Sequence, residues 1–270
     1  MNKELKGIGV IILEGIIIKD DTRYFHTENY LKKRGYVFSE LDMQPNSLDF
    51  IIFPFMGEVD CHIYNDGYLG SLKKDTIIFS GIRNAYLTDK CTEYGLSYYV
   101  LMEDKSVAVK NAVPTSEGVI AYLITNCLDT IANSQVLIIG YGICGKDLAK
   151  RLKGLGANVS ALVRNREKEW AAYVDSITPI YLEELFDNQP FDIIINTVPY
   201  PVLNNEILEK TKGTLLIDIA SKPYGFDMEY AKKLNEKSTL LPGIPGKYAI
   251  KTAGEILGEY IDCILKERKR

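Results

Sequence analysis

Short apolar runs rich in β-branched residues alternate with segments of helical periodicity along almost the whole chain. Such alternation is typical of α/β proteins, which bury parallel strands between layers of helices. The N-terminal part contains strand patterns at residues 15–19, 36–41, 50–53, 76–79 and 97–101. Helical patterns lie between them, and the clearest cover residues 24–34 and 83–94.

A second series of alternating patterns begins after Ser134. A helix is predicted just before it, at 115–131, with Pro114 in the first turn, where proline is favoured. An amphipathic helix is predicted at 249–267, although its pattern does not show which domain it packs against. The predicted strands of this series are 135–139, 158–163, 177–181, 193–196, 215–218 and 239–241, and its helices are 146–155, 204–210 and 227–235.

The length of 270 residues fits two domains better than one. We therefore predict an α/β fold of two Rossmann-like domains, with mostly parallel sheets and a cleft between them. The expected parts are a substrate-side α/β domain at 1–113, a linking helix at 114–133, an NAD(P)-binding Rossmann domain at 134–245 and a C-terminal helix at 246–270.

Charge and cysteine usage exclude several classes of function. The net charge is only −4, so no polyanion-binding surface is indicated and nucleic acid is not expected as a partner. The five cysteines are odd in number and form no C-x-x-C pair, which favours reduced thiols in the cytoplasm over a disulfide framework or a metal site. The apolar stretch at 8–18 contains Glu14 and is shorter than the roughly 20 residues that cross a bilayer, so a buried strand is predicted and no membrane contact.

The strongest chemical signal is a strand that runs directly into the pattern G-x-G-x-x-G. The first glycine makes the tight turn, the second lets the backbone approach a pyrophosphate, and the third lets the helix pack on the strand. The helix that follows offers free N–H groups and its positive dipole end to the phosphates. The predicted dinucleotide-binding turn consists of Gly140, Tyr141, Gly142, Ile143, Cys144 and Gly145.

The end of the second strand indicates which dinucleotide is bound. Arg164, Asn165 and Arg166 stand where an NAD-preferring domain usually carries an acidic residue, and guanidinium groups suit a ribose 2′-phosphate. We predict NADP, with NAD possible; the alternative is that the arginines simply begin a solvated helix. Turns after the later strands are expected to line the nicotinamide half, or to be purely structural, and their residues are Asn196, Thr197, Val198, Pro199, Ala220 and Ser221.

Several further segments resemble the A-subunit family of dipicolinate synthase, in the same order from about residue 21 to 257. The most specific are Asn111-Ala112-Val113-Pro114-Thr115-Ser116-Glu117-Gly118 and Pro242-Gly243-Ile244-Pro245-Gly246; Phe79-Ser80-Gly81-Ile82 and Asp218-Ile219-Ala220-Ser221-Lys222-Pro223 also contribute. The chain departs from the family at Ile143, where the family often has arginine, at Tyr224, where it has Pro-Gly-Gly, and at Asp20, where its Gly-Asp-x-Arg signature has glycine.

The resemblance implies an NADP-dependent dehydrogenation that forms pyridine-2,6-dicarboxylate from dihydrodipicolinate or its hydroxytetrahydro precursor. It places this reaction in the cytoplasm of the mother cell of a spore former. It also implies a homo-oligomer and a flavoprotein-like partner, the B subunit of dipicolinate synthase.

A dicarboxylate substrate requires cations and hydrogen-bond donors. The candidates are Arg23, Ser80, Gly81, Asn84, Asn111, Thr115, Lys222, Lys247, Lys251 and Thr252. Glu117 is the candidate general base because it is expected to open a helix; the alternative is that it caps that helix.

Two other functions stay open. One is an NADP-dependent dehydrogenase of a shikimate-like or 2-hydroxy acid, although neither His26 nor His62 is a convincing catalytic histidine. The other is a nucleotide-binding protein with a regulatory or scaffold role, which the uncharged Ile143 in the phosphate turn favours.

Overall fold

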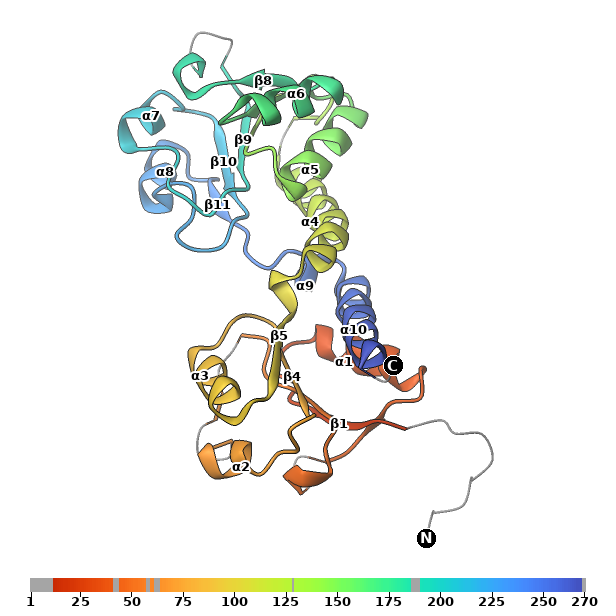
Figure 1. Ribbon diagram of the computed structural model, residues 1–270. Helices are drawn as coiled ribbons and strands as arrows, with labels where there is room; N and C mark the ends of the chain where they lie inside the picture. Colours follow the sequence, from red (N-terminus) through yellow and green to blue (C-terminus); the bar gives the residue numbers. More distant parts are fainter. Residues whose placement is uncertain are drawn as a thin grey trace. The chain divides into compact units, whose positions relative to one another are not determined.

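The computed structural model describes residues 12–40, 44–56, 59–60, 64–127, 129–185 and 190–268. These residues form two compact units (Figure 1). Unit 1 combines the N-terminal part up to Val107 with the C-terminal part from Ile250, and unit 2 is Ala108–Ala249. The first part of the predicted 8–18 strand lies outside the described residues, and its remainder contains the first strand of unit 1.

Unit 1 is built on a five-stranded parallel sheet in the order β2-β1-β3-β4-β5. Successive residues of its central strands are buried on opposite faces: Phe50 and Ile52 belong to one hydrophobic core, and Ile51 to the other. This two-sided burial explains why the strands are continuous apolar runs. The strands are β1 (Glu14–Ile17), β2 (Val37–Phe38), β3 (Phe50–Ile52), β4 (Ile77–Ser80) and β5 (Ser97–Val100), and the helices are α1 (Arg23–Lys32), α2 (Asp66–Gly70), α3 (Ala85–Tyr94) and α10 (Ile250–Glu267).

The closing helix α10 packs on α1, a placement that its sequence pattern left open. Small residues allow the close approach: a Cβ on Gly254 would lie 2.3 Å from the Arg23 carbonyl oxygen. Thr27 donates a hydrogen bond to the Gly254 carbonyl at 2.9 Å, and Tyr36 donates one to Asp262 at 2.8 Å. The last helix of the chain therefore completes the core of the first unit.

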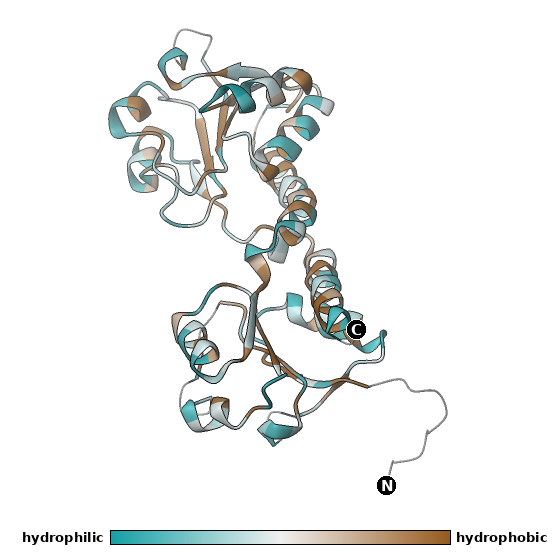
Figure 2. Ribbon diagram, in the orientation of Figure 1, coloured by the Kyte–Doolittle hydropathy of each residue, from teal (hydrophilic) through white to brown (hydrophobic). Residues whose placement is uncertain are grey.

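Unit 2 is built on a six-stranded parallel sheet in the order β11-β10-β9-β6-β7-β8. The chain runs outward from β6 to β8, then returns to β9 on the other side of β6, which is the doubly wound Rossmann order. Apolar residues gather on the strands of both sheets, whereas the helices show mixed surfaces (Figure 2). The strands are β6 (Gln135–Ile139), β7 (Asn158–Leu162), β8 (Thr178–Ile180), β9 (Ile193–Asn196), β10 (Leu215–Asp218) and β11 (Thr239–Leu240), and the helices are α4 (Lys105–Asn126), α5 (Ile143–Gly154), α6 (Arg166–Val174), α7 (Asn205–Glu209), α8 (Met228–Leu234) and α9 (Pro245–Tyr248). The predicted α/β class with parallel sheets is confirmed.

Helix α4 differs from the prediction. The expected helix covers 115–131 and follows Pro114, but α4 begins at Lys105, contains Pro114 and ends at Asn126. The start is set by Asp104, whose carboxylate accepts the backbone N–H groups of Ser106 and Val107. This cap places the helix start upstream, so the proline lies in the helix interior and the predicted boundary between 113 and 114 falls inside one helix.

Candidate functional site

The glycine turn lies between β6 and α5, and its three glycines have different surroundings. Gly140 has φ of +92°, and a Cβ there would lie 2.3 Å from Val198 Cγ2. A Cβ on Gly145 would lie 2.1 Å from the Gly140 carbonyl oxygen. A Cβ on Gly142 would meet nothing within 4 Å. The first and third glycines are therefore required by packing, whereas the second borders open space in which phosphate oxygens can approach the backbone.

The buried side chain of Tyr141 holds this turn to the rest of unit 2. Its side chain is buried, and its hydroxyl donates to Asp175 at 2.9 Å, while Asp175 pairs with Lys150 at 2.7 Å and Lys146 at 3.0 Å. Burial alone raises the pKa of Asp175, but the two ammonium groups and the hydroxyl outweigh it and lower that pKa to about 2. Only the backbone of Tyr141 is therefore available to a cofactor. Ile143 begins α5 with an exposed, uncharged side chain.

The predicted arginine pair follows β7. Asn165 caps α6 by accepting the Lys168 backbone N–H at 3.0 Å. Arg164 and Arg166 on either side are exposed, and neither forms an ion pair with any described residue. This arrangement is compatible with a solvated helix start and equally with two cations that bind an anionic ligand.

The turns after β9 and β10 are joined by buried polar contacts. Asn196 and Asp218, the last residues of these strands, are both fully buried and hydrogen-bonded to each other at 3.0 Å. Thr197 donates to the Ile139 carbonyl at 2.8 Å and so ties the β9 turn to the glycine turn. Ala220 is buried, whereas Pro199 and Ser221 are exposed. Asp218 was not among the predicted site residues, although an acidic residue at the end of a buried apolar strand was visible in the sequence.

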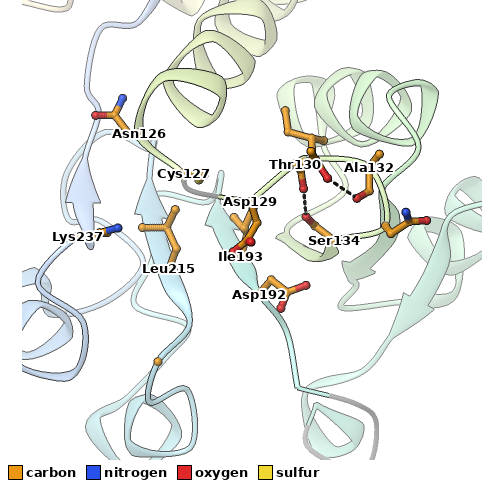
Figure 3. Close-up of a pocket in the computed structure, with 13 residues that line it drawn as sticks. Asn126, Cys127, Asp129, Thr130, Ala132, Ser134, Asp192, Ile193, Leu215 and Lys237 are labelled. Atoms are coloured by element: carbon orange, nitrogen blue, oxygen red, sulfur yellow. Dashed lines mark hydrogen bonds between the residues drawn. The ribbon is translucent and has the colours of Figure 1, made fainter.

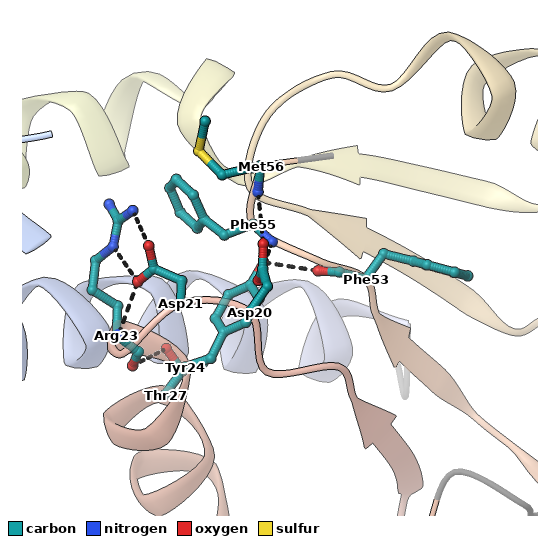
Figure 4. A network of polar contacts seen from close by, with 8 residues as sticks. All are labelled: Asp20, Asp21, Arg23, Tyr24, Thr27, Phe53, Phe55 and Met56. Atoms are coloured by element: carbon teal, nitrogen blue, oxygen red, sulfur yellow. Dashed lines mark hydrogen bonds and ion pairs between the residues drawn. The ribbon is translucent and has the colours of Figure 1, made fainter. Parts of the chain in front are cut away.

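In unit 1, Arg23 lies within a network at the carboxyl edge of the sheet (Figure 4). It binds Asp21 through two bonds, of 2.8 and 2.7 Å, and its guanidinium lies 3.6 Å from the Phe55 ring centre. Burial raises the pKa of Asp21, but the hydrogen bonds from Arg23 outweigh it and hold that pKa below its usual value. Asp20 accepts the backbone N–H groups of Phe55 at 2.6 Å and Met56 at 3.1 Å. The charge of Arg23 is thus already balanced by Asp21, which lies just before α1.

Three other predicted substrate residues of unit 1, Ser80, Gly81 and Asn84, lie beside Phe55 or Tyr98, two aromatic residues that were not predicted as part of the site. A Cβ on Gly81 would lie 2.4 Å from the Phe55 carbonyl oxygen. The Tyr98 hydroxyl lies 2.6 Å from Ser80 Oγ and accepts the Asn84 backbone N–H at 3.1 Å. The Asn84 side chain itself caps α3, so it is engaged within the fold.

The remaining candidates are distributed over both units. Lys251 and Thr252 are exposed in the first turn of α10 in unit 1. In unit 2, Asn111 is buried in α4 and its carbonyl accepts the Thr115 hydroxyl, while Lys222 and Lys247 are exposed.

Glu117 does not open a helix. It lies well inside α4, its side chain is 59% exposed, and its carboxylate is 3.4 Å from Arg151 Nη1. Both premises from the sequence, the position at a helix start and the capping alternative, are therefore wrong, because Asp104 already marks the helix start more than three turns upstream.

A pocket of ≈ 550 Å³ lies at the amino edge of the unit 2 sheet (Figure 3). It includes Ser134 just before β6 and the first residues of β9 and β10, Ile193 and Leu215. The glycine turn is at the opposite, carboxyl edge, where ligands bind in open α/β sheets. This pocket is therefore separate from the cofactor turn. Over the part of the chain that is described, no cluster of three metal-ligating side chains occurs, and no helix has the length and apolarity to cross a membrane.

Comparison with known proteins identifies the relatives. Residues 121–220 match the NAD binding domain family of D-isomer specific 2-hydroxyacid dehydrogenases. The chain is 38% identical over 193 residues to the A subunit of dipicolinate synthase from Bacillus subtilis (strain 168); this alignment covers 71% of the chain and 65% of the relative. The crystal structure of the A chain of dipicolinate synthase from Bacillus subtilis superposes with a TM-score of 0.87 at 30% identity, covering 96% of this chain and 97% of that one. The A subunit of dipicolinate synthase from Bacillus halodurans gives a TM-score of 0.84 at 27% identity, covering 94% and 97%.

These likenesses agree with the glycine turn. The match to an NAD binding domain and the open space at Gly142 establish a domain of the nicotinamide-dinucleotide-binding kind in unit 2. The resemblance seen in the sequence is confirmed over nearly the whole chain: the protein belongs to the A-subunit family of dipicolinate synthase.

Proposed function

We propose that this protein is an NADP-dependent dehydrogenase that converts dihydrodipicolinate, or its hydroxytetrahydro precursor, to pyridine-2,6-dicarboxylate. The observation that carries the proposal is the open backbone cradle at Gly142, in a chain 38% identical to the A subunit of dipicolinate synthase. We further propose a cytoplasmic site of action in a sporulating mother cell, a flavoprotein-like second subunit and a homo-oligomer.

The reaction removes two hydrogens from the ring of dihydrodipicolinate. One C–H bond breaks with both electrons and a second carbon loses a proton, so the ring becomes aromatic; the hydroxytetrahydro precursor first loses water. The nicotinamide, when bound, accepts the hydride. Because aromatisation drives the step, the main tasks of the protein are to orient the substrate and exclude water. The role of Glu117 as the base stays a prediction, and its ion pair with Arg151 does not favour it.

We propose that Arg23, although paired with Asp21, binds a substrate carboxylate through its remaining nitrogen. Asp21 occupies Nε and Nη2, whereas Nη1 makes no hydrogen bond with the described residues. Its position over the Phe55 ring and its two bonds to Asp21 hold the guanidinium in one orientation, so little conformational entropy is lost when it binds a carboxylate.

Turnover tests this proposal directly. Purified protein is mixed with NADP and dihydrodipicolinate, alone and together with the second subunit, and the ultraviolet absorbance of the pyridine product is followed. We expect product to appear in step with reduced cofactor. No turnover under either condition would refute the proposal.

The preference for NADP is tested at Arg164 and Arg166. We expect the double variant Arg164→Ala/Arg166→Ala to lose about 100-fold or more in affinity for NADPH, because each charged hydrogen bond to a phosphate contributes about 1.5–3 kcal/mol and the variant removes two such donors. The affinity for NADH should stay within about twofold, since NADH lacks the 2′-phosphate. Calorimetric titration measures both. Lys232→Ala, which removes one positive charge at an exposed position of α8, is the control. Equal losses of affinity for both nucleotides would show that the arginines do not bind the 2′-phosphate.

Residues 121–220 match the NAD binding domain of D-isomer specific 2-hydroxyacid dehydrogenases, so oxidation of a 2-hydroxy acid is an alternative function. Such an enzyme needs an acid–base group beside the substrate carbonyl. His26 lies on α1 against Gly254 of α10 and edge-on to Phe25, so it serves the packing of unit 1; His62 lies outside the described residues. Lactate and related 2-hydroxy acids in the same turnover assay separate the two functions.

A further inference from the structure

The carboxylate of Asp218 is fully buried at the end of β10 and is surrounded by N–H donors alone. It accepts hydrogen bonds from Asn196 Nδ2 at 3.0 Å, from the Ala220 backbone at 2.9 Å and from the Gly225 backbone at 2.7 Å. It makes no ion pair with any residue that the structure describes. A buried carboxylate without a cation is stable only where such donors replace water. These three bonds therefore hold two separate turns to one point.

The first of these turns is the one after β9. Both polar atoms of the Asn196 side chain bond to Val198: Nδ2 donates to the Val198 carbonyl at 2.9 Å, and Oδ1 accepts the Val198 N–H at 3.1 Å. Val198 in turn fills the place that a side chain on Gly140 would need, at 2.3 Å. The orientation of Asn196, which Asp218 sets, is thus transmitted to the glycine turn.

The second turn is the loop after β10. Its end, Gly225, is packed so closely that a Cβ would lie 2.3 Å from Asn196 Cγ. The Gly225 carbonyl accepts the backbone N–H groups of Val202 at 2.8 Å and Leu203 at 3.1 Å. The loops after β9 and β10 are therefore clamped to each other, with Asp218 at the centre of the clamp.

We propose that Asp218, together with Gly225, is the positioning element for the nicotinamide half of the cofactor site. It does so by holding the 196–199 turn and the 218–225 loop in one arrangement at the carboxyl edge of the sheet. This inference rests on the proposed cofactor function and assigns no contact between Asp218 and the cofactor. The clamp reaches the glycine turn only at its first residue, Gly140, through Val198, whereas Gly142, where phosphate oxygens would approach, borders open space. Loss of the clamp should therefore affect the nicotinamide half of the dinucleotide more than the phosphates.

The test compares two ligands. The variant Asp218→Asn keeps the shape of the side chain but turns an –NH₂ group toward at least one of the three N–H donors. We expect about a tenfold or larger loss in affinity for NADPH. The affinity for 2′-phospho-ADP-ribose, which lacks the nicotinamide, should stay within about twofold of the parent protein. If the parent prefers NADH, the same comparison uses NADH and ADP-ribose.

Two further variants keep the result interpretable. Gly225→Ala disturbs Asn196 while leaving Asp218 in place, and it should reproduce the selective loss if Asp218→Asn does not fold. Thr214→Val removes a buried bond, from Thr214 Oγ1 to the Phe191 carbonyl, at the other end of β10, and should change neither affinity. Equal losses for both ligands, or no loss at all, would overturn the positioning role. A parent protein that binds neither nucleotide would instead refute the cofactor proposal, and this inference with it.

Discussion

The variant Gly142→Ala is expected to fold as stably as the parent protein and yet to lose nucleotide binding. A Cβ at this position meets no protein atom within 4 Å, and the backbone φ of −90° suits alanine. The free energy of unfolding should therefore stay within about 1 kcal/mol of the parent value. The same methyl group projects into the space that phosphate oxygens must enter, so affinity for NADPH should fall by about tenfold or more.

Gly145→Ala is the matched contrast. Its Cβ would lie 2.1 Å from the Gly140 carbonyl oxygen, which is backbone and cannot rotate away. We expect a loss of about 1–3 kcal/mol in stability, typical of overpacking, together with loss of binding. Urea denaturation measures stability and calorimetric titration measures affinity. NADPH affinity within twofold of the parent in Gly142→Ala would contradict the placement of the pyrophosphate at this turn.

Deletion of residues 250–270 is expected to unfold unit 1 and to leave unit 2 folded. The deletion removes four buried side chains of α10 from the core of unit 1, and each contributes about 1.5–3 kcal/mol. Their sum is comparable with the whole stability of a typical domain, about 5–15 kcal/mol. The four are Ile256, Leu257, Ile261 and Leu265.

Hydrogen exchange measured by mass spectrometry follows the two units separately. We expect amides of β1, β3 and β4 to lose protection and those of β6, β9 and β10 to keep it. The point variant Leu257→Ala should destabilise unit 1 by about 2–5 kcal/mol, whereas Cys263→Ala, at an exposed position on the same helix, should be nearly neutral. Protected unit 1 strands in the shortened protein would show that α10 is dispensable.

Sequence patterns were most successful where a local run of residues is sufficient to define the structure. The strand that ends at Ile139, the glycine turn and α5 follow one another directly, so periodicity and turn chemistry identify all three. Helix α4 shows the limit. Pro114 is a good helix start by local rules, but the cap at Asp104 and the buried face of α4, which includes Val119 and Leu123, make the helix continue through the proline.

The residues of the candidate site also divide into those that local sequence predicts and those whose contacts only the structure shows. Arg23 was selected from the sequence as a cation for the substrate, but only the structure shows that Asp21 already binds two of its nitrogens and that Phe55 covers it. Asp218 was visible as the end of a strand, yet its three donors lie on two segments, the end of β9 and the loop after β10, and this is why its role was missed.

The α/β class, the dinucleotide turn and the family are predictable from the amino-acid sequence alone, because they depend on periodicity and on motifs a few residues long. Three features become apparent only in the folded protein: the last helix belongs with the first unit, Asp21 neutralises Arg23, and Asp218 joins two turns. Each of these depends on contacts between groups that the sheet order or helix packing brings together, as when Thr27 bonds to Gly254, 227 residues away. Local sequence patterns do not predict such contacts, because the free energy of each contact is gained only after the intervening helices and strands have packed.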